Sequence, residues 1–259
     1  MNILVFDIET IPDVEGGKRV LGLSGVTESE SLMAMSRRRR QETNGTSDFI
    51  RHHLHKVIAI SVAMRAGDEF RVWSLGSESS SESELIKRFF EGIEKYTPVL
   101  VSWNGNGFDL PVLHYRALIN SVVARAYWDD GIDRKDFRYD NYLSRYHKRH
   151  LDLMDSLAGY QSKAYASLDQ IATLMGFPGK LGISGSDVLK KYLEGDLTGI
   201  RDYCETDVLN TWLVYLRFEY MRGRIDSVTI DREIQMTKSF LENSERNHFH
   251  QFLSAWGIN

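Results

Sequence analysis

The sequence predicts one α/β domain followed by a helical C-terminal part. Strand-like apolar stretches are concentrated in the first 102 residues with one amphipathic helix between them, and helical periodicity dominates the second half. The candidate strands are residues 3–8, 57–64, 70–75, 99–102 and 150–153. The candidate helices are residues 83–96, 110–119, 168–175, 186–193, 197–222 and 228–256.

Each element has a local signal. Residues 3–8 are apolar apart from Asp7, as expected of a strand covered on both faces. Residues 65–69 contain Gly67 and Asp68 and predict a hairpin turn between the second and third strands. The helix at 83–96 has apolar residues three and four positions apart, and Pro111 is tolerated near the start of the helix that follows the fourth strand.

Two segments do not match any of these predicted strands or helices. Residues 22–51 are rich in Ser, Glu and Arg, with four consecutive arginines at 37–40, and predict a long loop that is functional or mobile. Those arginines could contact phosphates by releasing counterions, or form a solvated surface. Residues 131–150 combine six Lys and Arg and three Asp with interleaved aromatic residues, a composition typical of single-strand binding. The alternative is a solvated loop; if it binds, we expect phosphate contacts from Arg145, Lys148 and Arg149.

Composition excludes several classes of protein. The chain has 259 residues, 42% hydrophobic and 26% charged, with 32 Lys and Arg against 36 Asp and Glu and a net charge of −4. These values exclude a wholly disordered chain and argue against a histone-like binder. The single Cys204 excludes an internal disulfide framework and a multi-thiolate zinc site. We expect a cytoplasmic protein, because no apolar run is long enough to span a bilayer and the N-terminus lacks a signal-peptide pattern.

Two carboxylates stand at the end of the first strand. Asp7 and Glu9 are separated by one residue, so on a strand they project from the same side while Ile8 returns to the core. The carboxyl end of a buried strand is where open α/β sheets place their ligands. The alternative is a strand end that merely reaches solvent.

Two further motifs carry candidate residues. The run Trp103-Asn104-Gly-Asn-Gly107-Phe108-Asp109 follows the fourth strand, and its aspartate precedes a helix, where it could serve only as an N-cap. Tyr203 and Asp207 are four residues apart on the long helix at 197–222 and therefore share one face. Each signal is weak by itself, because aspartates often cap helices and this helical spacing occurs by chance.

Together and in this order, the three motifs resemble those of the DEDD 3′–5′ exonucleases, in the branch with tyrosine in the third motif. The second motif is most similar to the proofreading domain of family B DNA polymerases. Residues 150–155, 179–180 and 203–218 are similar to a bacterial family of stand-alone predicted exonucleases related to that domain. The resemblance implies a ribonuclease H-like mixed sheet flanked by helices in residues 1–223, with a helical extension at 224–259.

The resemblance also implies roles for the motif residues. Asp7, Glu9, Asp109 and Asp207 would bind two divalent cations, Mg²⁺ or Mn²⁺, and Tyr203 would position the attacking water. Two carboxylates about 4 Å apart repel by about 4 kcal/mol at an effective dielectric of about 20, and two such ions offset four carboxylates. Asp7 is the candidate to bridge both ions.

The expected activity is hydrolysis of single-stranded nucleic acid from the 3′ end, releasing nucleoside 5′-monophosphates. DNA is the leading substrate, with RNA, a non-catalytic binding module and a small-molecule phosphodiesterase as alternatives. We expect Thr10, Asn104 and Phe108 to contact the substrate; no protein partner is indicated. His52, His53 and His55 are not expected to bind metal, because they lack acidic or cysteine partners at a fixed spacing. Asp152 and Asp155 are assigned roles in the structure or behind the metal ligands, because the motif places the catalytic aspartate at Asp109. Cys204 has no redox partner and is expected to serve helix packing.

Overall fold

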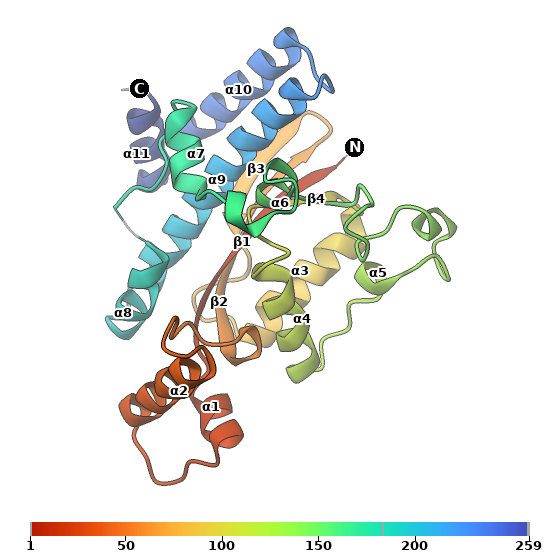
Figure 1. Cartoon of the computed structure of the whole chain (residues 1–259). Coiled ribbons are helices and arrows are strands. Elements are labelled where there is room, and N and C mark those ends of the chain that lie inside the picture. Colours follow the sequence, from red (N-terminus) through yellow and green to blue (C-terminus); the bar gives the residue numbers. More distant parts are fainter. Residues whose placement is uncertain (1, 183, 258–259) are drawn as a thin grey trace.

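The computed structural model describes residues 2–182 and 184–257, and within them five strands form one sheet (Figure 1). The strand order is β3-β2-β1-β4-β5. β1 pairs antiparallel with β2 and parallel with β4, β2 pairs antiparallel with β3, and β4 pairs parallel with β5. This is the mixed sheet that a ribonuclease H-like fold implies. The strands are β1 (Ile3–Pro12), β2 (His55–Ala66), β3 (Glu69–Ser74), β4 (Val99–Ser102) and β5 (His150–Asp152).

Helices cover both faces of the sheet. α3 (Glu82–Tyr96), α4 (Asp109–Ile119) and α5 (Arg125–Trp128) pack on one face, where Leu4 and Phe6 of β1 are buried. α9 (Leu197–Met221) crosses the other face with Val5 beneath it, together with α7 (Leu168–Leu174). Because side chains alternate along a strand, this arrangement turns Asp7 and Glu9 toward α9. The shorter helices are α6 (Leu153–Leu157), α8 (Val188–Leu193) and the 3₁₀ turns His52–Leu54, Lys135–Arg138, Ser162–Ala164 and Gly185–Asp187.

The prediction of a long loop at 22–51 is wrong. The chain forms α1 (Val14–Leu21) and then α2 (Glu28–Glu42). α2 begins with a capping box, in which Thr27 Oγ accepts the Glu30 N–H at 3.2 Å and the Glu30 carboxylate accepts the Thr27 N–H at 2.7 Å. Gly17 lets α1 and α2 approach closely, since a Cβ there would lie 2.3 Å from the Met35 sulfur. Only Ser31 and Met35 are buried on α2, so it lacks the broad apolar stripe by which a helix is recognised in a sequence.

The prediction of one helix at 228–256 also needs correction. The segment forms α10 (Ser227–Glu242) and α11 (Asn247–Trp256), both packed against α9. The break follows Asn243, whose amide donates to the Ser239 carbonyl, while Ser244 Oγ accepts the Arg246 N–H. Short polar side chains of this kind compete with helical backbone hydrogen bonds and end the helix. The last two residues of the expected extension, 258–259, lie outside the described residues.

No helix in the described part of the chain combines the length and the apolar character that crossing a membrane requires.

Candidate active site

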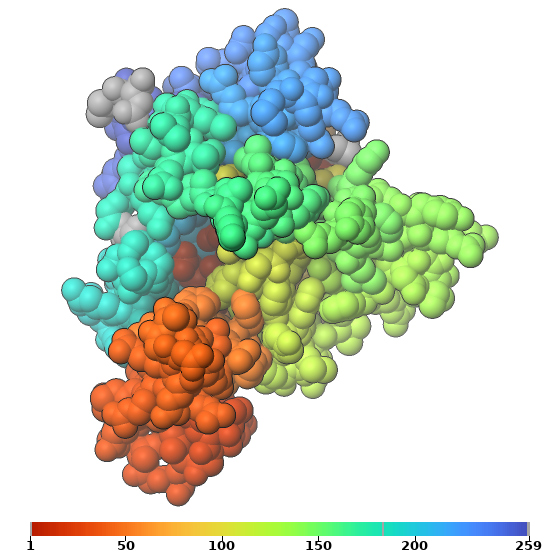
Figure 2. Space-filling model, in the orientation of Figure 1, coloured from red at the N-terminus to blue at the C-terminus, as the bar shows by residue number. Residues whose placement is uncertain are grey.

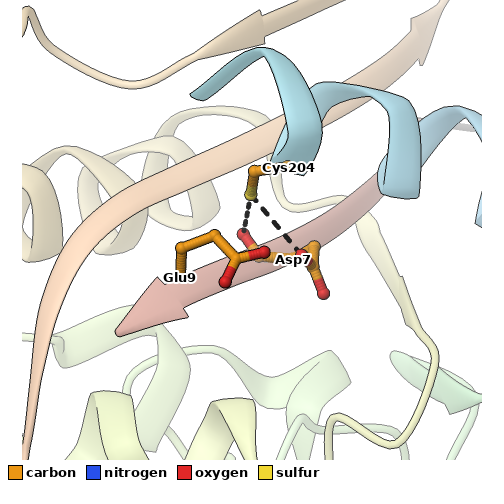
Figure 3. Close-up of side chains that lie close together, drawn as sticks. All are labelled: Asp7, Glu9 and Cys204. Carbon is orange, nitrogen blue, oxygen red and sulfur yellow. Dashed lines mark hydrogen bonds between the residues drawn. The ribbon is translucent and has the colours of Figure 1, made fainter. Parts of the chain in front are cut away.

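The candidate site begins at Asp7 and Glu9, near the carboxyl end of β1 (Figure 3). One ligand atom from each of Asp7, Glu9 and Cys204 lies within 4.8 Å of the others. The Cys204 thiol lies 3.5 Å from Asp7 Oδ2 and 3.5 Å from the Asp7 carbonyl oxygen. Glu9 is buried although it lies beyond Asp7 on the strand, which does not fit the alternative of a strand end that merely reaches solvent; Asp7 itself is partly exposed.

Asp109 joins this cluster from the first turn of α4. Its Oδ1 accepts the backbone N–H of Ile8 at 3.2 Å, which places the carboxylate beside the segment that carries Asp7 and Glu9. Asp109 is 4% exposed. The N-cap position of α4 belongs to Phe108, with no side-chain cap, so the alternative role of Asp109 as a simple N-cap is wrong.

The loop before Asp109 is shaped by Asp152 at the end of β5. Asp152 accepts the Asn104 N–H at 3.1 Å on one oxygen and the Asn106 N–H at 2.8 Å on the other. Asn104 has a left-handed backbone with φ 65°, and Gly107 faces its side chain so closely that a Cβ would lie 2.3 Å from Asn104 Oδ1. Asp152 thus has the structural role expected of it, and the Asn104 contact with substrate stays a prediction.

The third part of the site is on α9. Tyr203 and Asp207 are both buried, and they share one face of α9 because they are one helical turn apart. The charge of Asp207 acts on Asp7, and the charges of both act on the Tyr203 phenol, so the three side chains belong to one cluster. Asp207 Oδ1 has no hydrogen-bond partner among the described residues, although it is buried. A buried and unpaired carboxylate oxygen is costly unless a cation or a donor completes it.

Burial and repulsion by neighbouring carboxylates raise the pKa values of all four acids. Burial is the largest cause for each; for Asp7 the charges of Asp109, Glu9 and Asp207 add to it, and for Glu9 those of Asp207 and Asp109. The pKa of Asp109 rises to about 7 and that of Asp207 to about 6. Lys180 acts in the opposite direction on Glu9 and Asp207. Such a cluster favours either protons or cations, and four carboxylates suit hard divalent ions.

Tyr203 and Cys204 stay protonated in this environment. Burial, followed by the charges of Asp207, Glu9 and Asp7, raises the pKa of the Tyr203 phenol far above its usual value. Burial and the Asp7 charge raise the pKa of the Cys204 thiol. The phenol is therefore a hydrogen-bond donor rather than a base. The expectation that Cys204 is simple helix packing is incomplete; its position three residues before Asp207 on the helix was the available signal.

A hollow opens beside the acids (Figure 2). The red atoms of the first strand are visible at its base, between the orange insertion, the yellow α4 region and cyan α8. Its cavity of about 730 Å³ is lined by Glu9, Thr10 and Phe108, together with residues from both ends of 32–50. Thr10 Oγ1 lies 2.9 Å from His55 Nδ1, which gives that histidine a local partner. The structure therefore brings Thr10 and Phe108 to the cavity beside the acids.

The basic segment at 131–150 divides into exposed and buried parts. Arg145 and Lys148 are exposed, and Arg145 lies over the Tyr160 ring at 4.4 Å. Arg149 is only 15% exposed, pairs with Asp136 at 2.6 Å and lies 4.0 Å from the Phe137 ring centroid. The Arg149 guanidinium thus holds its own segment together, and its expected contact with phosphate stays a prediction.

A second group of acids does not form a cation site. Asp202, Glu205 and His248 lie together, but the Arg246 guanidinium contacts Glu205 at 2.6 Å and Asp202 at 3.0 Å. This cation already neutralises the carboxylates and ties the start of α11 to α9. Sequence inspection missed the network because its members are separated by about 40 positions along the chain.

The fold and the site define an α/β protein with a buried acidic centre suited to divalent metal at the end of its central strand. Residues 47–256 match the family described as predicted 3′-5′ exonucleases related to the exonuclease domain of PolB. The chain belongs to this family, and the resemblance seen in its motifs is confirmed. The matched range contains Asp109, Tyr203 and Asp207, whereas Asp7 and Glu9 lie before it and are brought to the same cluster by the fold.

Similarity to individual polymerases is more limited. A 38-residue stretch is 53% identical to DNA polymerase 1 of Sulfurisphaera ohwakuensis, covering 15% of this chain and 4% of that protein. The structure of a family B DNA polymerase from the hyperthermophilic archaeon Pyrobaculum calidifontis aligns with 82% of this chain and 24% of the polymerase, at 18% identity and a TM-score of 0.49. The chain therefore corresponds to a small part of either polymerase.

Proposed function

We propose that the protein is a metal-dependent 3′–5′ exonuclease that hydrolyses single-stranded DNA and releases nucleoside 5′-monophosphates. The observation that carries the proposal is the convergence of four carboxylates from β1, α4 and α9, three of them buried and the fourth, Asp7, partly exposed. Membership of the exonuclease family supports it.

The acids have distinct positions in this proposal. Asp7, Glu9, Asp109 and Asp207 would hold two divalent cations, Mg²⁺ or Mn²⁺, and the unpaired Asp207 Oδ1 supports this fit. Two such ions, when bound, activate a water and stabilise the departing 3′ oxygen. The Ile8 N–H holds Asp109 in place. Tyr203 donates a hydrogen bond that orients the water, because its phenol stays neutral.

The substrate would enter the hollow beside Glu9. Thr10 and Phe108 line it and would contact the terminal nucleotide, with Asn104 at the adjacent loop. Arg145 and Lys148 would contact phosphates farther along the strand, as exposed cations beside aromatic rings do. We also infer a cytoplasmic location, since the one cysteine is a free, buried thiol that suits a reducing compartment.

Digestion of matched, end-labelled DNA and RNA strands tests the proposal. With Mg²⁺ or Mn²⁺, single strands should shorten stepwise from the 3′ end and yield 5′-monophosphates, and a chelator should stop the reaction. Asp7→Ala should abolish digestion, because it removes a proposed metal ligand. The fold should stay intact, because the substitution takes one charge out of a cluster of carboxylates that repel one another. Asp68→Ala, in the exposed β2–β3 turn, is the matched control and should keep the parental rate.

Other outcomes identify other functions. If RNA strands are digested faster than DNA strands, RNA is the substrate. Discrimination between the two depends on contacts to the 2′-hydroxyl, which only RNA carries. Strand binding without turnover would indicate a non-catalytic module. Parental digestion by Asp7→Ala would contradict the site itself.

A further inference from the structure

One wall of the hollow comes from the insertion between β1 and β2. Phe49 lines the cavity together with Glu9 and Thr10, and it is 55% exposed although it is a large aromatic side chain. Its ring centroid is 5.7 Å from that of Phe108 and 5.1 Å from that of His55. The rings of Phe49, Phe108 and His55 therefore meet at the cavity, and more than half of the Phe49 side chain is exposed.

The backbone around Phe49 is held in place by α2. Arg39 donates to the Phe49 carbonyl at 2.8 Å, and the Phe49 N–H donates to Ser47 Oγ at 3.1 Å. Arg40 pairs with Asp48 at 2.8 Å. Two of the four consecutive arginines thus brace the segment that carries Phe49.

The far end of the insertion is also joined to the catalytic side. A ring nitrogen of His52 lies 2.8 Å from the Gly107 carbonyl oxygen, in the loop that precedes Asp109. The His52 ring centroid is 5.7 Å from that of Phe108. The position of Phe49 is therefore tied to the position of the acids.

We propose that Phe49 is a specificity-determining residue that stacks on the unpaired base of the 3′-terminal nucleotide. The inference rests on the proposed exonuclease function and adds to it the chemical feature of the substrate that the insertion recognises. Aromatic faces bind single-stranded bases with little regard to sequence, whereas a base inside a duplex is already stacked and paired. The cavity of about 730 Å³ is within the range of about 300–1,000 Å³ that holds ligands of this size.

Phe49 and Phe108 occupy different positions in this subsite. Phe108 is partly buried and packs against the core cluster that contains Phe6 and Leu110. Phe49 is 55% exposed and packs against the rings of Phe108 and His55, so the rest of its ring is available to the base. The insertion therefore supplies the surface that makes an unpaired terminal base a favoured substrate.

The test compares substrates with and without the terminal base. Steady-state rates are measured on a DNA single strand ending in thymidine and on the same strand ending in a tetrahydrofuran abasic residue. Stacking contributes about 1–3 kcal/mol per base, so Phe49→Ala should raise KM on the thymidine strand by about 5- to 150-fold, with kcat nearly unchanged. KM on the abasic strand should not change, since that residue has no base to stack.

Two more variants separate stacking from loss of structure. Phe49→Tyr keeps the aromatic face and should restore the parental KM on the thymidine strand. Met33→Ala removes another exposed apolar side chain from α2, 53% exposed and outside the cavity lining, and should leave both KM values unchanged. An equal rise of KM on both strands would show that Phe49 only maintains the cavity wall and would overturn the proposal.

A binding measurement distinguishes failure of the subsite from failure of the exonuclease. A single strand ending in 2-aminopurine is titrated into the Asp7→Ala variant with Mg²⁺, and its fluorescence should be quenched on stacking. Adding Phe49→Ala should abolish the quenching. Quenching that depends on Phe49 supports the subsite even if the parent shows no turnover. Turnover by the parent, with a KM unchanged by Phe49→Ala, overturns the subsite while the exonuclease proposal stands.

Discussion

Asp109→Asn should stabilise the metal-free protein at alkaline pH while it weakens the metal centre. Asparagine keeps an oxygen that can accept the Ile8 N–H, so the contact at 3.2 Å survives and only the charge is removed. The folded protein holds a proton on Asp109 up to a pKa of about 7, whereas the unfolded chain releases it near 3.8. The free energy of unfolding of the parent therefore falls as the pH rises from about 4 to about 7.

The size of this effect follows from the pKa. One unit corresponds to about 1.4 kcal/mol, and the rise from 3.8 to about 7 sets an upper limit of about 4 kcal/mol. We expect Asp109→Asn to exceed the parent in stability by about 2–4 kcal/mol at pH 8 in a chelator, with no gain at pH 4. For a chain of this size this amounts to about 4–16 °C in Tm.

Urea or thermal unfolding at pH 4 and pH 8, with chelator and then with Mn²⁺, measures the prediction. Mn²⁺ should stabilise the parent by mass action and reduce or reverse the advantage of the variant, because the variant has lost one ligand charge. If Asp109→Asn destabilised the protein equally at both pH values in chelator, the pKa of Asp109 would not be raised in the folded state and the reasoning would be refuted. An unchanged Tm of the parent with excess Mn²⁺ would refute the metal centre.

Two further predictions concern groups around the acids. Tyr203→Phe should slow single-turnover cleavage by about 10- to 1,000-fold with metal and strand affinity nearly unchanged, because the variant lacks the hydroxyl proposed to orient the water. Asp207→Asn should be slower still, and a parental rate for Tyr203→Phe would show that the hydroxyl has no part in the reaction. Replacing Arg145 and Lys148 with alanine should reduce the log–log salt dependence of single-strand binding by about 1.4, or about 0.7 per phosphate contact. Arg149→Ala should instead lower the Tm, because the Arg149 guanidinium pairs with Asp136 and Phe137 of its own segment. If the variant lacking Arg145 and Lys148 has the same salt dependence as the parent, the segment has no role in binding.

Local sequence patterns predicted much of the fold. All five described strands were located to within a few residues. For β1, β2 and β4 the signal is an apolar run, since a strand buried on two faces must be apolar along most of its length. The helix at 197–222 was also predicted, and the structure forms it as α9, buried around most of its circumference. The spacing of Asp7 and Glu9, and that of Tyr203 and Asp207, determined which of these side chains share a face.

Elements without a long apolar pattern could not be assigned from sequence. α2 buries only two residues, so its capping box was the available sign of a helix. The break between α10 and α11 depends on polar side chains that bond to nearby backbone, and the helical periodicity on either side conceals it.

Tertiary structure alone decided how the site is assembled. Asp109 accepts a hydrogen bond from Ile8, 101 positions away in the sequence, and Cys204 contacts Asp7 across 197 positions. The periodicity of a sequence does not predict contacts between residues so far apart along the chain. Packing likewise brought Phe49 to the cavity and committed Arg149 to its own segment. Sequence determines which face of its own element a side chain occupies, because backbone geometry repeats every two or 3.6 residues. Which distant side chain it meets depends on how the helices pack on the sheet, since that packing fixes both the contacts and the burial that shifts each pKa.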